Sequence, residues 1–172
     1  VTCKDGGTRE VLISGMAIGD GFLATFADIT DRKNFERVLA EREEQLRLFV
    51  EYAPAAIAMF DLDMRYLAVS KRWCDDFTLE IQNVLGRTHY ELFPEIPERW
   101  REIHRRCLAG AVERAEEDLF LRADGREQWV IWEIRPWRKP SGQVGGIVCF
   151  SEDITGRKTA EQALYAAKEA AE

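Results

Sequence analysis

The stretch Asp-Ile-Thr-Asp-Arg-Lys at residues 28–33 recurs as Asp-Ile-Thr-Gly-Arg-Lys at residues 153–158, an offset of 125 residues (153 − 28). Each copy follows a short apolar run that is typical of a β-strand, at 22–26 and at 147–150. Upstream, the pair Asp5-Gly6 matches Asp124-Gly125 at an offset of 119 residues (124 − 5). An internal repeat of this kind indicates two copies of one structural unit.

Each copy reads as strand, Asp-Gly turn, strand, turn, strand and then helix, because Asp-Gly pairs favour tight hairpins. The first copy contains only this C-terminal half. We therefore predict four segments: C-terminal strands of a preceding repeat at 1–33, a coiled-coil-like linker helix at 34–51, a complete domain at 52–155 and the start of an exit helix at 156–172. A lone strand pair is marginal in water, so we expect 1–33 to find a partner edge, in a second chain or in the complete domain.

The segment after each Asp-Ile-Thr carries residues spaced alternately four and three apart, as in a heptad repeat. In the two copies these positions are Phe35, Leu39, Arg42, Leu46 and Phe49, and Ala160, Leu164, Ala167 and Ala171. A surface helix docked on its own domain would explain the pattern. The narrow stripe with charged flanks favours a parallel coiled coil instead. We predict a homodimer formed through helices 34–51 and 156–172.

The complete copy predicts an α+β domain with one antiparallel sheet. Two short strands at 57–60 and 65–69 form a hairpin, followed by a helix from Lys71 to Phe77 that Ser70 can cap. A short helical stretch lies between Gly86 and Pro94, and a longer helix runs from Pro97 to Gly110. Three strands follow, near 116–122, 128–137 and 144–152. In the strand 128–137 both faces carry large apolar groups, so both should be covered.

The overall composition excludes several classes of function. The chain is 46% hydrophobic and 32% charged, which is ordinary for a globular protein. Its net charge of −7 argues against a nucleic-acid surface and against anionic lipid. No apolar run approaches the roughly 20 residues of a membrane span. Four scattered cysteines and two histidines give no zinc pattern and suggest reduced thiols in the cytoplasm.

At this point the sequence resembles the PAS family. The resemblance rests on the two Asp-Ile-Thr-x-Arg-Lys motifs, the 86–94 stretch, the Arg-x-Asp-Gly hairpin at 122–125 and the Trp-Glu-Ile-Arg-Pro-Trp run at 132–137. It implies a five-stranded antiparallel sheet with helices packed on one face and a small cavity between them. Members of the family sit upstream of histidine kinases, diguanylate cyclases, phosphodiesterases and transcription regulators, and pass a signal through the exit helix.

The resemblance implies a signal-coupling role for the residues where the last strand becomes the exit helix. These residues are Asp153, Thr155 and Arg157, with Asp28, Thr30 and Arg32 in the first copy. The Thr155 hydroxyl can cap the helix, and Asp153 can bind backbone amides or pair with Arg157. A plain helix cap is the alternative interpretation.

Flavin-binding light sensors of the family carry a Gly-Arg-Asn-Cys motif and a glutamine on the last strand. This chain has His89 in place of the cysteine and Ser151 near the place of the glutamine, so flavin adduct chemistry is not expected. Heme-binding members use a histidine on the long helix, where this chain has His104 on the apolar face. Heme is the least favoured role for His104, after a small ligand and a structural role.

The residues that we expect to form a core or line a pocket are Met59, Trp73, Phe77, Phe93, Trp100, His104, Trp132 and Cys149. We expect His89 at the surface or in a cap, and the acidic stretch Glu113–Asp118 in solvent. Trp100 lies one turn before His104 and can occupy the space that a porphyrin needs.

The leading functional interpretation is a sensor and transmitter, coupled to an effector domain in the same full-length chain. The alternative is a ligand-free dimerisation and relay spacer. The sequence contains no phosphate-binding glycine loop, catalytic triad or metal cluster, so we expect no enzyme activity and no metal, apart from heme iron should His104 bind it.

Overall fold

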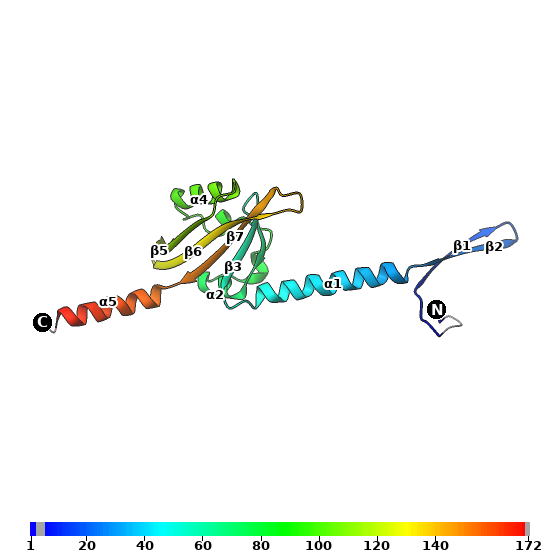
Figure 1. The fold of residues 1–172 in the computed structure, drawn as a ribbon, viewed down its shortest axis with the longest axis horizontal. Helices are drawn as coiled ribbons and strands as arrows, with labels where there is room; N and C mark the ends of the chain where they lie inside the picture. Colours follow the sequence, from blue (N-terminus) through cyan, green and yellow to red (C-terminus); the bar gives the residue numbers. More distant parts are fainter. Residues whose placement is uncertain (3–5, 171–172) are drawn as a thin grey trace. The chain divides into compact units, whose positions relative to one another are not determined.

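The computed structural model describes residues 1–2 and 6–170 and divides into two compact units, Val1–Arg47 and Leu48–Glu172. The boundary falls within helix α1 (Thr30–Glu51), so each unit contains part of that helix (Figure 1). Of the predicted Asp5-Gly6 turn, Gly6 is described and Asp5 lies outside the described residues. The heptad position Ala171 also lies outside them.

The second unit is an α+β domain. Its strands are β3 (Ala56–Asp61), β4 (Tyr66–Val69), β5 (Glu113–Leu121), β6 (Glu127–Arg138) and β7 (Val144–Asp153). Its helices are α2 (Lys71–Phe77), the 3₁₀ helix η1 (Ile81–Asn83), α3 (His89–Leu92), α4 (Glu98–Leu108) and α5 (Thr155–Glu169). The strands pair antiparallel in the order β4-β3-β7-β6-β5. The predicted five-stranded antiparallel sheet is therefore confirmed.

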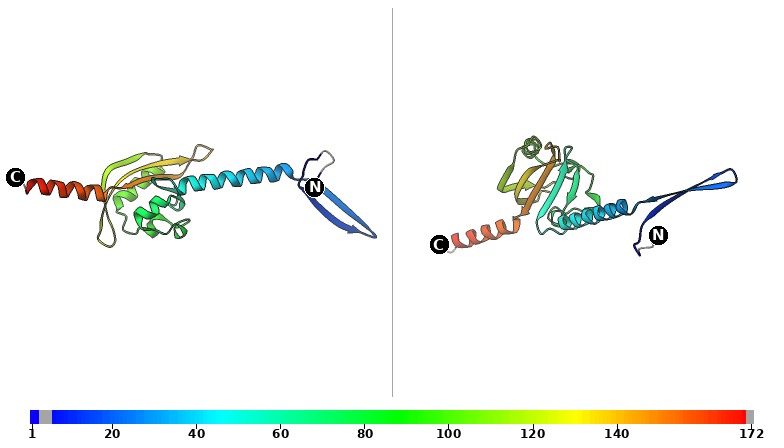
Figure 2. Two further views of the ribbon diagram at one scale, coloured as in Figure 1. Left: turned by 90° about the horizontal axis from the view of Figure 1, so that it is seen from below. Right: turned by 45° about the vertical axis from the view of Figure 1, so that its right-hand side comes forward.

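The helices cover one face of this sheet. Helix α2 contacts β3 and β7, whereas α4 contacts β6 and β7 (Figures 1 and 2). Along β6 the inward side chains Val130, Trp132 and Ile134 are buried, and their neighbours on the opposite face are half-buried or exposed. This alternation has the period of two that a pleated strand imposes. One face of β6 is therefore covered as expected, and the expected cover of the opposite face stays a prediction.

Local hydrogen bonds determine where the helices begin. The Ser70 hydroxyl accepts from the amide of Trp73 at 3.1 Å and caps α2, as predicted. Thr88 and Glu91 form a reciprocal capping box at the start of α3. Pro97 is the N-cap of α4, so that helix begins at Glu98.

The first unit contains a two-stranded sheet, β1 (Val11–Ile18) and β2 (Gly21–Asp28). Val11 pairs with Asp28 and Ile18 with Gly21, as Val130 pairs with Asp153 and Trp137 with Gly146 in β6 and β7. The two hairpins therefore share one register. The structure describes β1–β2 and the five strands of the second unit as two separate sheets, and the expectation that 1–33 finds a partner edge stays a prediction.

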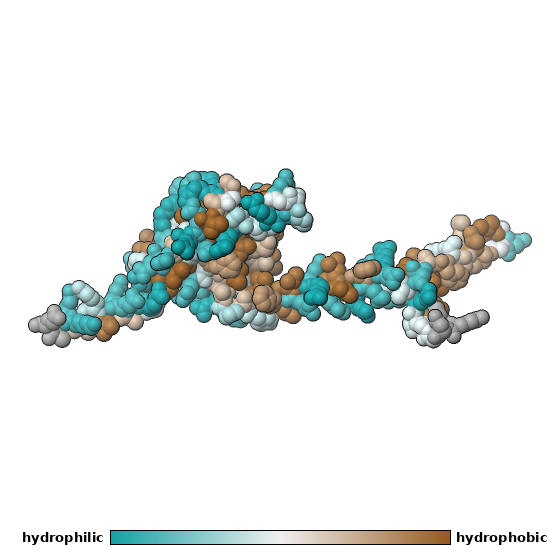
Figure 3. All heavy atoms as spheres, viewed as in Figure 1, coloured by the Kyte–Doolittle hydropathy of each residue, from teal (hydrophilic) through white to brown (hydrophobic). Residues whose placement is uncertain are grey.

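Hydrophobic side chains lie exposed on the β1–β2 hairpin, where Figure 3 shows a concentration of apolar surface. Phe22 is 73% exposed and Phe26 is 68% exposed. The pairing of this hairpin with a second chain stays a prediction. Among the described residues no helix is both long enough and apolar enough to cross a membrane.

Gly146 provides a test of the packing around β7. A Cβ on Gly146 would overlap the carbonyl oxygen of Phe60 and lie 2.7 Å from Trp137 Nε1. We expect Gly146→Ala to lower the free energy of unfolding by about 3 kcal/mol, because both neighbours are held in the sheet. Gly156, in α5, has open space around its Cβ position, so Gly156→Ala is the control and should stabilise by about 0.5 kcal/mol. Urea denaturation measures both. Equal effects of the two substitutions would contradict the register of β7 on β3.

Candidate functional site

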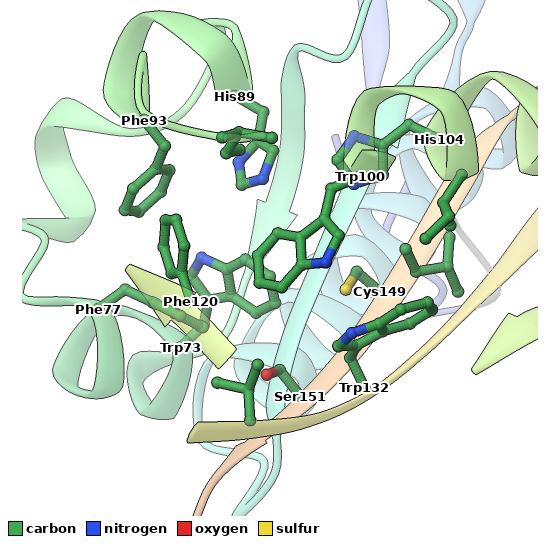
Figure 4. Close-up of a pocket in the computed structure, with 14 residues that line it drawn as sticks. Trp73, Phe77, His89, Phe93, Trp100, His104, Phe120, Trp132, Cys149 and Ser151 are labelled. Atoms are coloured by element: carbon green, nitrogen blue, oxygen red, sulfur yellow. The ribbon is translucent and has the colours of Figure 1, made fainter. Parts of the chain in front are cut away.

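A small cavity of about 40 Å³ lies between the helices and the inner face of the sheet (Figure 4). Because one water needs roughly 10–15 Å³ of such space, the cavity has room for a few waters or one very small molecule. Its lining residues are mostly aromatic: Trp73, Phe77, His89, Phe93, Ile96, Trp100, Ile103, His104, Phe120, Val130, Trp132, Ile134, Cys149 and Ser151.

Seven of the eight residues expected at a pocket line this cavity; Met59 does not. In β3 the buried residues are Ala56, Ala58 and Phe60, which point toward the helices. Met59 alternates with them and lies on the opposite face of the sheet, beside Ala68 and Val148. The expectation for Met59 is therefore wrong. The run 57–60 is apolar on both faces, so its composition did not distinguish them.

The expectation that His89 lies at the surface or in a cap is also wrong, because His89 lines the cavity and is only 8% exposed. Its Nδ1 lies 2.6 Å from the hydroxyl of Tyr66, a residue that is 1% exposed. The Tyr66 hydroxyl has no other acceptor among the described residues, so it donates its proton to Nδ1. A neutral imidazole then carries its own proton on Nε2. His89 is therefore a buried N–H donor at the first position of α3, whereas the sequence led us to expect a surface or capping role.

His104 lies beside His89, with ring centroids 5.6 Å apart. It is 5% exposed, and its Nδ1 lies 2.9 Å from the hydroxyl of Tyr90. Burial, and to a lesser extent the charge of Arg101, lowers the pKa of His104 to about 4. Burial also lowers the pKa of His89 well below its ordinary value, assisted by His104 and Arg101. Both imidazoles are therefore neutral at pH 7.

The expectation that the whole acidic stretch 113–118 lies in solvent is wrong at Asp118, which is bonded to two indoles and an arginine. Its Oδ2 accepts hydrogen bonds from the indole nitrogens of Trp100 at 2.8 Å and of Trp132 at 3.0 Å. Arg99 pairs with the same carboxylate at 2.7 Å. Burial opposes ionisation of Asp118, but the hydrogen bonds from Arg99 and the two indoles outweigh it and hold its pKa below the ordinary value. An irregularity in strand pairing between Ala115 and Asp118 accompanies this inward position.

The cavity does not fit heme. A porphyrin is at least as large as the drug-sized ligands that occupy pockets of about 300–1,000 Å³, whereas this cavity measures about 40 Å³. The rings of Trp100 and Phe120, with centroids 4.9 Å apart, occupy the space beside His104. A flavin does not fit this cavity either, because the cavity volume of about 40 Å³ is too small for it.

A network of hydrogen bonds, here called the junction lock, joins β7 to α5. Asp153 Oδ1 accepts from the Thr155 amide at 2.8 Å, and Thr155 Oγ1 accepts from the Trp129 amide at 2.9 Å. Asp153 thus binds a backbone amide, the first of the two alternatives expected for it, and Arg157 pairs with Glu161. The expected cap by the Thr155 hydroxyl is wrong, because this hydroxyl faces β6 and the N-cap of α5 is Ile154.

The first copy contains the same lock. Asp28 Oδ1 accepts from the Thr30 amide at 3.0 Å, and Thr30 Oγ1 accepts from the Glu10 amide at 2.9 Å. Glu10 matches Trp129 at the upstream offset of 119 residues (129 − 10). Arg32 pairs with Glu36 on the helix surface at 2.9 Å, outside the lock. The repeated motif therefore builds one repeated junction.

These features agree with the comparison to known proteins. A family model described as the PAS fold matches residues 50–159, and the chain belongs to this family. Over 152 residues it is 30% identical to the virulence sensor protein BvgS of Bordetella pertussis, covering 84% of this chain and 12% of BvgS. It is 26% identical to the two-component sensor PprA of Pseudomonas aeruginosa over 140 residues, 80% of this chain and 15% of PprA.

Solved structures show the same fold. The PAS domain of Bordetella pertussis BvgS has a TM-score of 0.54 and 24% identity, covering 76% of this chain and 98% of that domain. The PAS domain of an HTR-like protein from Haloarcula marismortui has a TM-score of 0.52 and 24% identity, covering 71% and 99%. The chain spans only 12% of the length of BvgS and 15% of the length of PprA.

The buried histidines make stability depend on pH. The folded-state pKa of His104 is about 4 against an ordinary value of 6.5, so between these values the unfolded chain binds a proton that the folded chain does not. Stability should therefore fall as the pH is lowered, by about 2 kcal/mol between pH 7 and pH 5 for His104, and further for His89. We expect His104→Gln to remove its part of this dependence and the double variant with His89→Gln to remove most of the whole. Urea titrations from pH 5 to pH 7 measure the slope. An unchanged slope in the double variant would contradict neutral burial.

Proposed function

We propose that this module senses a small ligand in the cavity and transmits its presence through α5. Strand β7 is the observation that carries the proposal. Cys149 and Ser151 of β7 line the cavity, and Asp153, two residues farther along, holds the start of α5. A shift of β7 at the cavity therefore acts on the helix junction directly. A ligand drives such a shift only through different affinities for two arrangements of the junction.

The ligand class follows from the chemistry of the cavity. The walls are aromatic and the two imidazoles are neutral, which disfavours a charged ligand. The Nε2–H of His89 is a donor, so it favours a ligand with one acceptor oxygen. Small, neutral, mostly apolar molecules with a carbonyl or ether oxygen meet these requirements, with side chains such as Trp100 moving to admit them.

We further propose that the module works as a homodimer through its heptad helices. In α1, Phe35 is 76% exposed, Leu39 is 60% exposed and Leu46 is 67% exposed, on one stripe. No residue of α1 is buried within this chain. An unpartnered apolar stripe with charged flanks is what a parallel coiled coil covers. In α5, Leu164 is 60% exposed and continues the same pattern.

The module is proposed to contribute no catalysis of its own. Its effector, of the histidine kinase or diguanylate cyclase and phosphodiesterase classes, would lie elsewhere in the full-length chain, as the curated relatives are longer sensors. The free thiols of Cys74, Cys107 and Cys149 support a cytoplasmic location. A ligand-free relay is the second candidate, because Asp118 fixes both Trp100 and Trp132 around a small cavity.

Cyclopentanone and cyclopentane test the sensing proposal, because they differ by one acceptor oxygen. We expect cyclopentanone to bind saturably in a titration followed by ¹H–¹⁵N NMR, and to shift the imidazole signals of His89 and the amides at the start of α5. His89→Phe should weaken this binding by about tenfold, since the variant loses the donor. Cyclopentane should bind equally well to both forms. Non-saturable shifts, or none near α5, would leave the ligand-free relay as the function.

The dimer proposal is tested by introducing charge into the stripe of α1. Leu39→Glu should weaken dimerisation by at least about tenfold, because it buries a carboxylate in the seam. Ala40→Glu adds the same charge beside the seam and is the matched control, expected to change the dissociation constant by less than about twofold. Sedimentation equilibrium measures both constants. Equal effects of the two substitutions would argue for a dimer formed elsewhere or for a monomer.

A further inference from the structure

Arg122 joins the cavity wall to the neighbourhood of the junction lock. Its guanidinium lies over the rings of Phe93 and Phe120, 5.2 Å from each ring centroid. Both rings line the cavity and meet edge to face, with centroids 6.2 Å apart. The Arg122 side chain is only 14% exposed, so these contacts fix its position. A displacement of either ring therefore displaces the guanidinium.

Gln128 continues the connection from Arg122 to the lock. Its Oε1 accepts from Arg122 Nη1 at 3.0 Å, and its Nε2 donates to Asp153 Oδ2 at 2.8 Å. The same Nε2 donates to the carbonyl of Asp76 at 2.9 Å, near the end of α2, the helix that carries Trp73 and Phe77. Gln128 is 7% exposed. One buried amide thus binds Arg122, α2 and the lock.

The first copy has a different residue at this position. Residue 9 matches residue 128 at the offset of 119 (128 − 9), and Arg9 pairs with Asp28 Oδ2 at 2.9 Å. An arginine can donate to the aspartate but has no acceptor for a second guanidinium, whereas a glutamine amide donates and accepts at once. The lock is therefore common to both copies, and the link to a neighbouring arginine requires the glutamine.

We infer that Gln128 is the positioning residue that couples the cavity to the exit helix, through the contacts Phe93/Phe120–Arg122–Gln128–Asp153. The inference rests on the proposed function for its biological meaning. A polar cleft of about 160 Å³, bordered by Arg122, Gln128, Asp153 and Thr155, lies beside this chain of contacts. Because a packed interior resists displacement, this cleft gives the lock space to rearrange when the guanidinium moves.

A double-mutant cycle tests the coupling without ligand or effector. Phe120→Leu perturbs the cavity wall, and Gln128→Arg reproduces the lock of the first copy while cutting the link to Arg122. The readout is hydrogen exchange of the Ile154 and Thr155 amides, both of which donate within the junction. Rates are normalised to the amides of β3. We expect Phe120→Leu to speed this exchange about fivefold in the parent protein and less than about twofold in the Gln128→Arg background.

The controls separate coupling from general loosening. Arg126 also borders the cleft but bonds to Asp124, so Arg126→Ala should leave the fivefold effect of Phe120→Leu intact. Should Phe120→Leu or Gln128→Arg fail to fold, Phe93→Leu replaces the first and Arg122→Met replaces the second, with the same expectations. An effect of equal size in both backgrounds, or no effect in the parent protein, overturns the inference. Because no ligand is used, failure of the cyclopentanone titration leaves this result unaffected, and the reverse also holds.

Discussion

Burying a polar atom in an aromatic core is costly when the atom has no hydrogen-bond partner, and several contacts of this domain follow from that cost. Asp118 is the clearest case, because a single carboxylate oxygen binds both indole nitrogens that face each other across α4 and β6. The Tyr66 hydroxyl is likewise the hydrogen-bond partner of His89, and the Gln128 amide is the partner of Asp153. Each of these bonds joins two different elements, through residues that lie 14 to 25 positions apart. The cavity exists because rings held in this way cannot collapse into it.

The fold was predictable because its signals are local or repeated. The Asp-Gly turn and the capping residue Ser70 each act within a few residues, and the Asp-Ile-Thr motif occurs twice at an offset of 125 residues. Along β6 both faces carry large apolar groups, so the sequence did not indicate which face is inward. The same limit applies at Met59, since a four-residue apolar run gives no alternation.

The site was less predictable because its chemistry depends on partners from other elements. Nothing near His89 in the sequence indicates Tyr66, which lies 23 residues away. Asp118 sits among glutamates that remain in solvent, and only the irregular pairing of β5 distinguishes it. The role of Thr155 was misjudged for a related reason: its hydroxyl has a nearer partner on β6 than on its own helix. A ligand-lining residue can be proposed from composition, but its protonation and orientation come from the tertiary fold.

The shared register of α1 and α5 has a consequence for how such modules can be joined. Phe35 lies seven residues after Asp28, and Ala160 lies seven residues after Asp153, so both apolar stripes leave their junctions at the same angle. An α-helix turns by about 100° per residue, so a single inserted residue would rotate a stripe by about a quarter turn. Seven inserted residues would nearly restore it. In the proposed coiled coils, linker length therefore sets the rotational position of each apolar stripe, and insertions of about seven residues preserve that position.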